Sequence, residues 1–204
     1  GGEMAHLIDQ SMIQFRILNR KRGPAVQAPR AQADKYTYAR LAKETVEAEP
    51  NLSIFMDTVT DLLVEGGKCI GVRTKRGHDI TASVIVLTTG TFMEGRIFIG
   101  EYDAPEGRLE EPAAIGLGSA LRRRGFPVGR LKTGTPARVR KSTVDLDRLE
   151  IQSGDDEMWS FSFDYTEVNR PSVPCHITWT NEKTHEIITA NIKRSPLYGG
   201  KIVG

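Results

Sequence analysis

Ser83-Val84-Ile85-Val86-Leu87-Thr88-Thr89-Gly90 is the stretch of this 204-residue chain that decides the predicted fold. Its β-branched run does not alternate with polar residues, which is the pattern of a strand buried on both faces in a parallel sheet covered by helices. In open α/β sheets, ligands lie beyond the carboxyl ends of the strands. Thr89 and Gly90 stand at that end, where small side chains let a cofactor approach the backbone closely. The stretch therefore predicts a cofactor-binding edge.

The segments before this strand predict two helices and a β-meander. Apolar residues recur at helical spacing over residues 3–13 and 31–48, and Pro50 ends the second helix. Three short apolar runs, separated by Gly-containing turns, then predict strands at residues 52–56, 59–64 and 70–74. With the buried strand, they predict an α/β fold that contains a parallel sheet and a meander.

The second half of the chain has irregular patterning and a polarised charge. Residues 112–124 predict a short helix that ends at Gly125. Residues 122–141 contain eight Lys and Arg and no acidic residue, whereas residues 143–167 are predominantly acidic. This separation is hidden in the whole chain, where 28 Lys and Arg against 26 Asp and Glu give a net charge of +2.

Composition excludes several classes of protein. A hydrophobic content of 39% fits an ordinary globular chain and neither a collagen nor a disordered tail. Two cysteines form no disulfide framework, which indicates a reducing compartment. No uncharged run is long enough to span a membrane, and no signal peptide is present. The chain begins at Gly1 and stops at Gly204 after a strand-like stretch, so we expect that both ends are cuts.

Two basic clusters are candidate phosphate-binding sites. The chain has no Gly-x-Gly-x-x-Gly turn after a strand and no P-loop, so a dinucleotide pyrophosphate needs residues from elsewhere. The segment from Arg130 through Lys132 to Arg138 combines cations with hydroxyls and a glycine, which suits an anion. The second cluster contains Arg16, Lys21 and Arg30. A solvated basic loop without a ligand is the alternative for both clusters.

Cysteine chemistry is a weaker candidate. Cys69 lies inside a predicted strand and is expected to be a small buried hydrophobe. Cys175 is a candidate nucleophile, with His176 beside it and His185 further on. Neighbouring strand residues point to opposite faces, so His176 cannot activate Cys175 directly. Cys175, His176 and His185 lack a fourth ligand at a spacing that zinc could use, so no metal site is predicted.

Several longer motifs follow one another in a fixed order along the chain. They are Ile13-Gln14-Phe15-Arg16-Ile17-Leu18-Asn19, Lys21-Arg22-Gly23-Pro24-Ala25-Val26, Arg30-Ala31-Gln32-Ala33-Asp34, Thr88-Thr89-Gly90-Thr91-Phe92, Gly129-Arg130-Leu131-Lys132-Thr133-Gly134-Thr135-Pro136, Pro174-Cys175 with Thr180-Asn181-Glu182-Lys183-Thr184-His185, and Arg194-Ser195-Pro196. Together they resemble the GidA family of FAD-dependent tRNA wobble-uridine modification enzymes, and the resemblance covers essentially the whole chain.

The resemblance implies an enzyme that adds a carboxymethylaminomethyl or aminomethyl group to carbon 5 of the tRNA wobble uridine. It implies a GTPase partner called MnmE, FAD as cofactor, NADH as reductant, methylene-tetrahydrofolate as one-carbon donor, and glycine or ammonium as amine. It also implies a cytoplasmic homodimer. The basic residues named above then become candidate contacts to tRNA or to cofactor phosphate.

The resemblance also implies cofactor contacts at Val59 and at Ala114, where the family often carries Ser. By the resemblance, we expect the family's Gly-rich FAD fingerprint and a Cys-Asn-Pro stretch before Gly1. An Arg-Tyr-Cys-Pro stretch, associated with nicotinamide binding and catalysis, is expected after Gly204. The chain therefore resembles an internal piece that is inactive by itself, and Cys175 lies in neither of these two cysteine stretches.

The predicted architecture is part of a Rossmann-type FAD-binding domain over residues 1–92, followed by an inserted α/β region on the substrate side over residues 93–204. Two other functions stay open. One is a related flavoprotein, such as the folate-dependent tRNA uridine methyltransferase. The other, for the isolated piece, is an RNA-binding module without catalysis.

Overall fold

The computed structural model describes residues 2–164 and 168–202. Its α-helices are α1 (Glu3–Ser11), α2 (Lys35–Ala48), α3 (Leu117–Arg123) and α4 (Glu182–Asn191). Its strands are β1 (Met12–Leu18), β2 (Ala28–Ala33), β3 (Val59–Glu65), β4 (Lys68–Thr74), β5 (Asp79–Thr81), β6 (Ile97–Ile99), β7 (Tyr102–Ala104), β8 (Glu150–Gln152) and β9 (Cys175–Ile177). Short 3-10 helices are η1 (Pro24–Val26), η2 (Lys141–Thr143), η3 (Leu146–Arg148) and η4 (Ile192–Arg194). No helix in the described ranges has the length and apolar character needed to cross a membrane.

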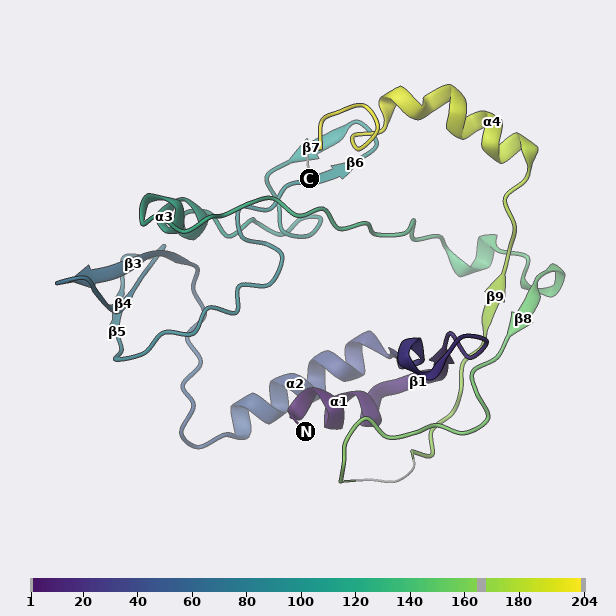
Figure 1. Cartoon of the computed structure of the whole chain (residues 1–204), viewed down its shortest axis with the longest axis horizontal. Helices are drawn as coiled ribbons and strands as arrows, with labels where there is room; N and C mark the ends of the chain where they lie inside the picture. The colour runs from purple at the N-terminus through teal and green to yellow at the C-terminus, as the bar shows by residue number, and fades with distance from the viewer. Residues whose placement is uncertain (1, 165–167, 203–204) are drawn as a thin grey trace. The chain divides into compact units, whose positions relative to one another are not determined.

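The chain forms two compact units, each built from two separate stretches of sequence. Unit 1 consists of Gly1–Ile54 and Arg138–Trp179, and unit 2 consists of Phe55–Ala137 and Thr180–Gly204. The described sheets are small and antiparallel, with β1-β2 and β8-β9 in unit 1 and β3-β4-β5 and β6-β7 in unit 2 (Figure 1). The mixed α/β class is confirmed. The division into domains 1–92 and 93–204 stays a prediction.

Unit 1 is built around the junction of α1 and β1. Met12 is the C-cap of the helix and the first residue of the strand, so the chain changes period without a loop. Met12, Phe15 and Met158 form the buried core. The Phe15 ring meets the Phe161 ring edge-on at 6.1 Å between centroids, an arrangement that aromatic pairs favour. The core therefore joins the first stretch of unit 1 to its second stretch.

The predicted helix over residues 31–48 begins later than expected. Residues 28–33 pair with β1 as a strand, and Asp34 caps α2 by accepting a hydrogen bond from the backbone N–H of Thr37 at 2.7 Å. An Asp at the N-cap satisfies one of the free N–H groups of the first turn. Cross-strand pairing therefore prevails over the helical spacing of the preceding alanines.

A buried glutamine connects the two sheets of unit 1. Gln14 is 1% exposed, and its Nε2 donates to the carbonyl oxygens of Gln152 at 3.3 Å and Val173 at 3.1 Å. A buried amide is costly unless it is hydrogen-bonded, so these contacts fix β1 against β8 and the approach to β9.

Unit 2 contains the predicted meander with α3 packed against it. Leu62 of β3 lies in a buried cluster with Leu117 and Leu121 of α3. The strands predicted at residues 59–64 and 70–74 are confirmed with slightly different bounds, and β5 follows them. The helix predicted from residue 112 starts at Leu117, and Gly125 follows its end with φ +85°.

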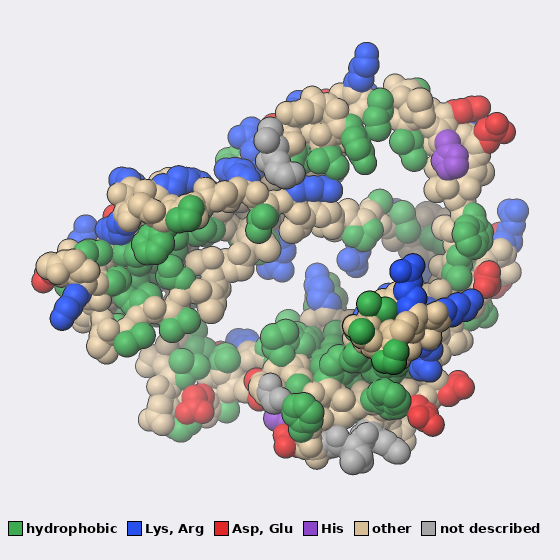
Figure 2. All heavy atoms as spheres, viewed as in Figure 1, with side chains coloured by type: hydrophobic (Ala, Val, Ile, Leu, Met, Phe, Trp, Pro, Cys, Tyr) green, Lys and Arg blue, Asp and Glu red, His purple; other side chains and the backbone are tan. Residues whose placement is uncertain are grey.

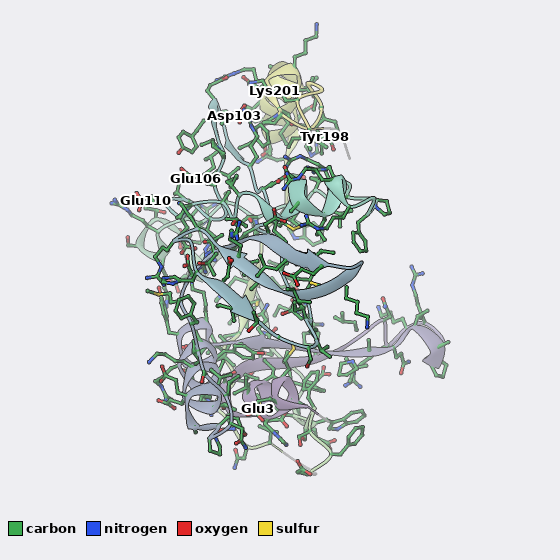
Figure 3. All side chains as sticks on the ribbon, turned by 90° about the vertical axis from the view of Figure 1, so that its left-hand side faces the viewer. Glu3, Asp103, Glu106, Glu110, Tyr198 and Lys201 are labelled. Carbon is green, nitrogen blue, oxygen red and sulfur yellow. The ribbon has the colours of Figure 1, made fainter. Side chains whose placement is uncertain are left out.

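The hairpin of β6 and β7 is followed by a polar loop that its own side chains hold in place. The Tyr102 hydroxyl donates to the Glu106 carboxylate at 2.5 Å, and this bond raises the pKa of Tyr102. Glu106 also accepts the backbone N–H of Glu110 at 3.1 Å. Glu106, Glu110 and Asp103 are labelled in Figure 3. Asp103 pairs with Arg96, which lowers the pKa of its carboxyl group.

The strand predicted at residues 83–90 is wrong for the described structure. Residues 84–89 form neither helix nor strand, and the side chains of Val84 and Val86 are 75% and 78% exposed. A buried parallel strand needs neighbouring strands on both sides to hydrogen-bond its backbone. No described strand pairs with this run, so most of its apolar side chains remain exposed.

Two smaller predictions also fail. Residues 52–56 form no strand, and Cys69, expected to be buried, is exposed on β4. Figure 2 shows that hydrophobic side chains, drawn in green, also reach the surface elsewhere. Large exposed side chains include Phe55, Leu131, Trp179, Ile187 and Ile188. Extended apolar surface of this kind is typical of regions that pack against further protein or ligand.

Candidate functional site

The predicted cofactor residue Val59 starts β3 directly after an ion pair. The carboxylate of Asp57, whose side chain is 6% exposed, accepts from Arg76 Nε at 2.9 Å and from the backbone N–H of Thr58 at 2.8 Å. Arg76 also donates to the carbonyl oxygen of Met56 at 2.6 Å. Burial raises the pKa of Asp57, but hydrogen bonds from Arg76, Thr74 and Thr58 outweigh it and hold this pKa well below its usual range.

Replacing Asp57 with asparagine is expected to destabilise the protein at pH 7 and to matter progressively less in acid. Because the folded pKa is depressed, the carboxylate stabilises the fold above its unfolded pKa of about 4, and this contribution is lost as the pH falls below that value. Thermal unfolding of both proteins at pH 7, 5 and 3.5 measures the difference. Asp79→Asn, at an exposed pair with Arg73, is the control and is expected to have a small effect. A difference in thermal unfolding between the unmodified protein and the Asp57→Asn variant that grows in acid would contradict the lowered pKa of Asp57.

Val59 and Ala114 flank a close backbone approach between Thr60 and Gly116 in unit 2. Gly116 has φ +117°, and a Cβ atom there would stand 3.0 Å from the carbonyl oxygen of Thr60. Both predicted cofactor residues are within two positions of this close backbone approach. The structure therefore brings together two residues that are 55 positions apart in the sequence.

Ala114 is also tied to the segment after Gly90. Its N–H donates to the carbonyl oxygen of Phe92 at 3.1 Å, and its own carbonyl accepts from the N–H of Glu94 at 2.8 Å. Gly90 has φ +60°, a conformation that glycine adopts without strain. The backbone N–H of Ala114 is therefore occupied, and its carbonyl oxygen keeps one lone pair for a ligand.

Glu94 is a functional candidate that the sequence analysis missed. It has φ +49°, which is strained for a side chain other than glycine. Its carboxylate accepts from Ser119 N at 2.8 Å, Ser119 Oγ at 2.8 Å and Arg122 Nη1 at 2.9 Å. The Ser119 and Arg122 hydrogen bonds lower the pKa of Glu94. The only sequence signal was a carboxylate beside Gly95, just after the predicted ligand edge.

The basic segment over residues 126–140 has neither helix nor strand. Arg130 Nη1 donates to the carbonyl oxygen of Glu94 at 2.9 Å. By contrast, the exposed side chains of Lys132 and Arg138 form no hydrogen bond or ion pair with any residue that the structure describes. The charge of this segment is therefore available to an anion, except where Arg130 is already engaged.

The other basic cluster lies on the hairpin of β1 and β2. Arg16 is directly opposite Arg30, and like charges at such a position repel each other. Nε of Arg30 is buried and has no hydrogen-bond partner among the described residues. The Asp155 carboxylate brings one negative charge to the hairpin, where it pairs with Arg20 at 2.6 Å and accepts from Ile17 N at 2.7 Å. Lys21 lies in the exposed turn between the strands. The hairpin keeps an excess of positive charge.

Cys175 is surrounded by amides. Its Sγ lies 3.5 Å from Gln32 Oε1 and 3.8 Å from Gln14 Oε1. These two oxygens accept from a thiol and do not stabilise a thiolate, whereas Gln14 Nε2 donates to the sulfur at 3.6 Å and is not a base. His185 Nε2 is 2.8 Å from the hydroxyl of Thr180. No group of metal-binding side chains occurs among the residues that the structure describes. The geometry gives Cys175 no base, and its catalytic role stays a prediction.

Comparisons with known proteins agree on one family. The family model of glucose inhibited division protein A matches residues 1–204. The chain is 53% identical over 213 residues to a protein of Treponema denticola and 55% identical over 206 residues to one of Borreliella burgdorferi. Both are named tRNA uridine 5-carboxymethylaminomethyl modification enzyme MnmG. They match 100% of this chain and 34% and 33% of their own lengths, so the chain spans about a third of these relatives.

A solved structure is also similar. GidA of Aquifex aeolicus, in its form I crystal, matches the whole chain with a TM-score of 0.90 and 46% identity, over 35% of its own length.

Proposed function

Since the chain belongs to the glucose inhibited division protein A family, we propose that it acts as part of an FAD-dependent enzyme that modifies the tRNA wobble uridine. The product would be a carboxymethylaminomethyl or aminomethyl group on carbon 5. The observation that carries this proposal is identity of 50% or more, over the full length of the chain, to proteins named for that modification.

FAD fits the residues near Gly116. The N-terminal end of β3 and the Ala114 carbonyl offer backbone groups to a planar ring, and Thr89 and Gly90 allow close approach. We assign Val59, Ala114, Thr89 and Gly90 to this cofactor. Bound FAD would supply the redox chemistry, and the chain positions it. The exposed run over residues 84–87 supports a Rossmann-type sheet completed by strands from a longer protein.

The remaining components follow from the same proposal. NADH is the reductant, methylene-tetrahydrofolate is the one-carbon donor, and a GTPase of the MnmE type and a second copy of the protein are the partners, in the cytoplasm. The cations of both basic clusters would contact tRNA phosphates, because such contacts give affinity without reading sequence. The proposed contacts are Arg16, Lys21, Arg30, Lys132 and Arg138, whereas Arg130, predicted from the sequence to contact phosphate as well, is assigned no contact because it already donates to the Glu94 carbonyl oxygen.

Nucleoside analysis tests this function. In a strain that lacks the full-length gene, mass spectrometry of digested tRNA is expected to show loss of the carboxymethylaminomethyl and aminomethyl uridines, with restoration on complementation. Loss of 5-methyluridine instead would indicate the related methyltransferase. Purified full-length protein is expected to contain FAD that NADH reduces, and a flavin-free protein that binds tRNA without altering it would indicate a binding module.

Lys21→Gln in the full-length protein is expected to weaken tRNA binding about threefold to tenfold at 0.1 M salt, because one phosphate contact is lost. The slope of log affinity against log salt should become shallower by about 0.7 to 0.9. Arg40→Gln is the control, since Arg40 already pairs with Glu44 at 2.7 Å on α2. Equal slopes for both variants and the unmodified protein would remove Lys21 from the RNA-binding surface.

A further inference from the structure

We propose that Glu94 is a positioning residue that fixes the basic segment through Arg130, and that Arg130 anchors this segment whereas Lys132 contacts RNA phosphate. The inference deepens the proposed function and rests on it. It concerns Glu94, α3 and the part of the basic segment before Arg138, all of which belong to unit 2.

The first step is the space made for the Glu94 side chain. A Cβ atom at Gly118 would lie 2.8 Å from the carboxyl carbon of Glu94, so a larger residue at this position of α3 would displace the carboxylate from its present place. Ser119 then binds the carboxylate through its N–H and its hydroxyl. Glycine inside a helix costs about 1 kcal/mol relative to alanine. The helix therefore gives up intrinsic stability where it accommodates this side chain.

The second step is the backbone of Glu94. Its left-handed conformation is held by three hydrogen bonds at the carboxylate and by the bond from its N–H to Ala114. Strained residues persist only where their surroundings over-determine them, and they concentrate at functional sites. Here the strain orients the Glu94 carbonyl oxygen, which accepts from Arg130.

The third step is the difference between Arg130 and Lys132. Val128 packs against the cluster of Leu62, Leu117 and Leu121, and Arg130, two residues later, donates to a backbone carbonyl. Beyond this point Leu131 is 97% exposed and the Lys132 side chain has no partner in the described ranges. Fixing Arg130 therefore extends the held part of the segment to the residue before Leu131 and lowers the entropy lost when RNA orders Lys132.

Equilibrium binding of an unmodified tRNA transcript to the full-length protein, over a range of salt concentrations, tests the proposal. Lys132→Gln is expected to make the salt slope shallower by about 0.7 to 0.9. Arg130→Gln and Glu94→Gly should weaken binding about fivefold with unchanged slope, since they loosen the segment without removing a phosphate contact. The double variant that combines Glu94→Gly with Arg130→Gln should bind tRNA no more weakly than either of these two single variants.

Two further variants separate positioning from general damage. Gly118→Ala favours the helix by its propensity but displaces the Glu94 carboxylate, so it should behave as Glu94→Gly does. Glu94→Gln keeps an oxygen acceptor for Ser119 and should bind within about twofold of the unmodified protein. Chymotrypsin cleavage after Leu131, which is exposed and unaltered in every variant, should accelerate in the Glu94→Gly and Gly118→Ala variants and not in the Glu94→Gln variant.

If Arg130→Gln makes the salt slope as shallow as Lys132→Gln does, Arg130 contacts phosphate and is not an anchor. Additive losses of tRNA affinity in the double variant of Glu94 and Arg130 would also overturn the assignment of Arg130 as an anchor. Unchanged cleavage after Leu131 in the Glu94→Gly variant would overturn the role of Glu94. If Lys132→Gln changes neither slope nor affinity while Arg130→Gln and Glu94→Gly accelerate this cleavage, the proposed RNA contact fails and the anchor stands.

Discussion

Val86→Lys in the full-length protein is expected to abolish FAD retention or to lower the midpoint of thermal unfolding by many degrees. In the described structure Val86 is 78% exposed in an unpaired extended run, where lysine would be harmless. In a parallel strand covered on both faces, by contrast, an unpaired ammonium group costs several kcal/mol, about 3 or more. The outcome therefore tells whether strands from a longer protein complete the sheet.

The matched control is Val64→Lys. Val64 is 45% exposed near the Gly66-Gly67 turn of the meander, on a strand that already has its hydrogen-bonded neighbour. Its replacement should change the unfolding free energy by less than about 0.5 kcal/mol. The ratio of FAD to protein and the midpoint of flavin release measure both variants. If the Val86→Lys variant retains FAD as the Val64→Lys variant does, the run over residues 84–87 is a solvent-exposed loop and the proposed sheet is wrong.

Local periodicity predicted the elements that form from neighbouring residues. α1, β3, β4 and the glycine turns stand at or near the predicted positions, because each depends on spacing within one short stretch. Residues 83–90 fail for the opposite reason. A parallel strand is defined by partners distant in sequence, and its apolar pattern shows only that it suits burial, not that a partner is present.

The candidate site divides in the same way. Val59 and Ala114 came from a family resemblance, and the structure adds their proximity through Gly116 and Thr60. The pair of Asp57 and Arg76, 19 positions apart, could not be read from spacing. Nor could Glu94, whose partners lie 25 to 36 positions further along the chain. Such contacts depend on how α3 packs on the meander, which no sequence window contains.

Asp9→Ala is expected to release the segment over residues 160–162 from α1. Asp9 is 4% exposed, and its carboxylate accepts from Ser160 Oγ at 2.6 Å, Phe161 N at 2.8 Å and Ser162 N at 3.0 Å. Removing it leaves the backbone N–H groups of Phe161 and of the buried Ser162 without their acceptor, whereas the Ser160 hydroxyl can still donate to the Ser162 carbonyl oxygen at 2.8 Å. Each hydrogen bond to a charged group is worth about 1.5 to 3 kcal/mol. A total loss of about 2 to 4 kcal/mol is expected after relaxation and entry of water.

Hydrogen exchange in the full-length protein measures this effect where it arises. A local loss of about 2 kcal/mol or more corresponds to amide exchange roughly thirtyfold faster at Phe161 and Ser162. Asp9→Asn keeps one acceptor oxygen and should lie between the two extremes. Asp156→Ala is the control, since Asp156 is exposed and its replacement should leave these amides protected. Because Phe161 packs on the core of Met12 and Phe15, faster exchange in the Asp9→Ala variant should extend to β1. If its exchange instead equals that of the Asp156→Ala control, the core and not Asp9 holds the segment over residues 160–162.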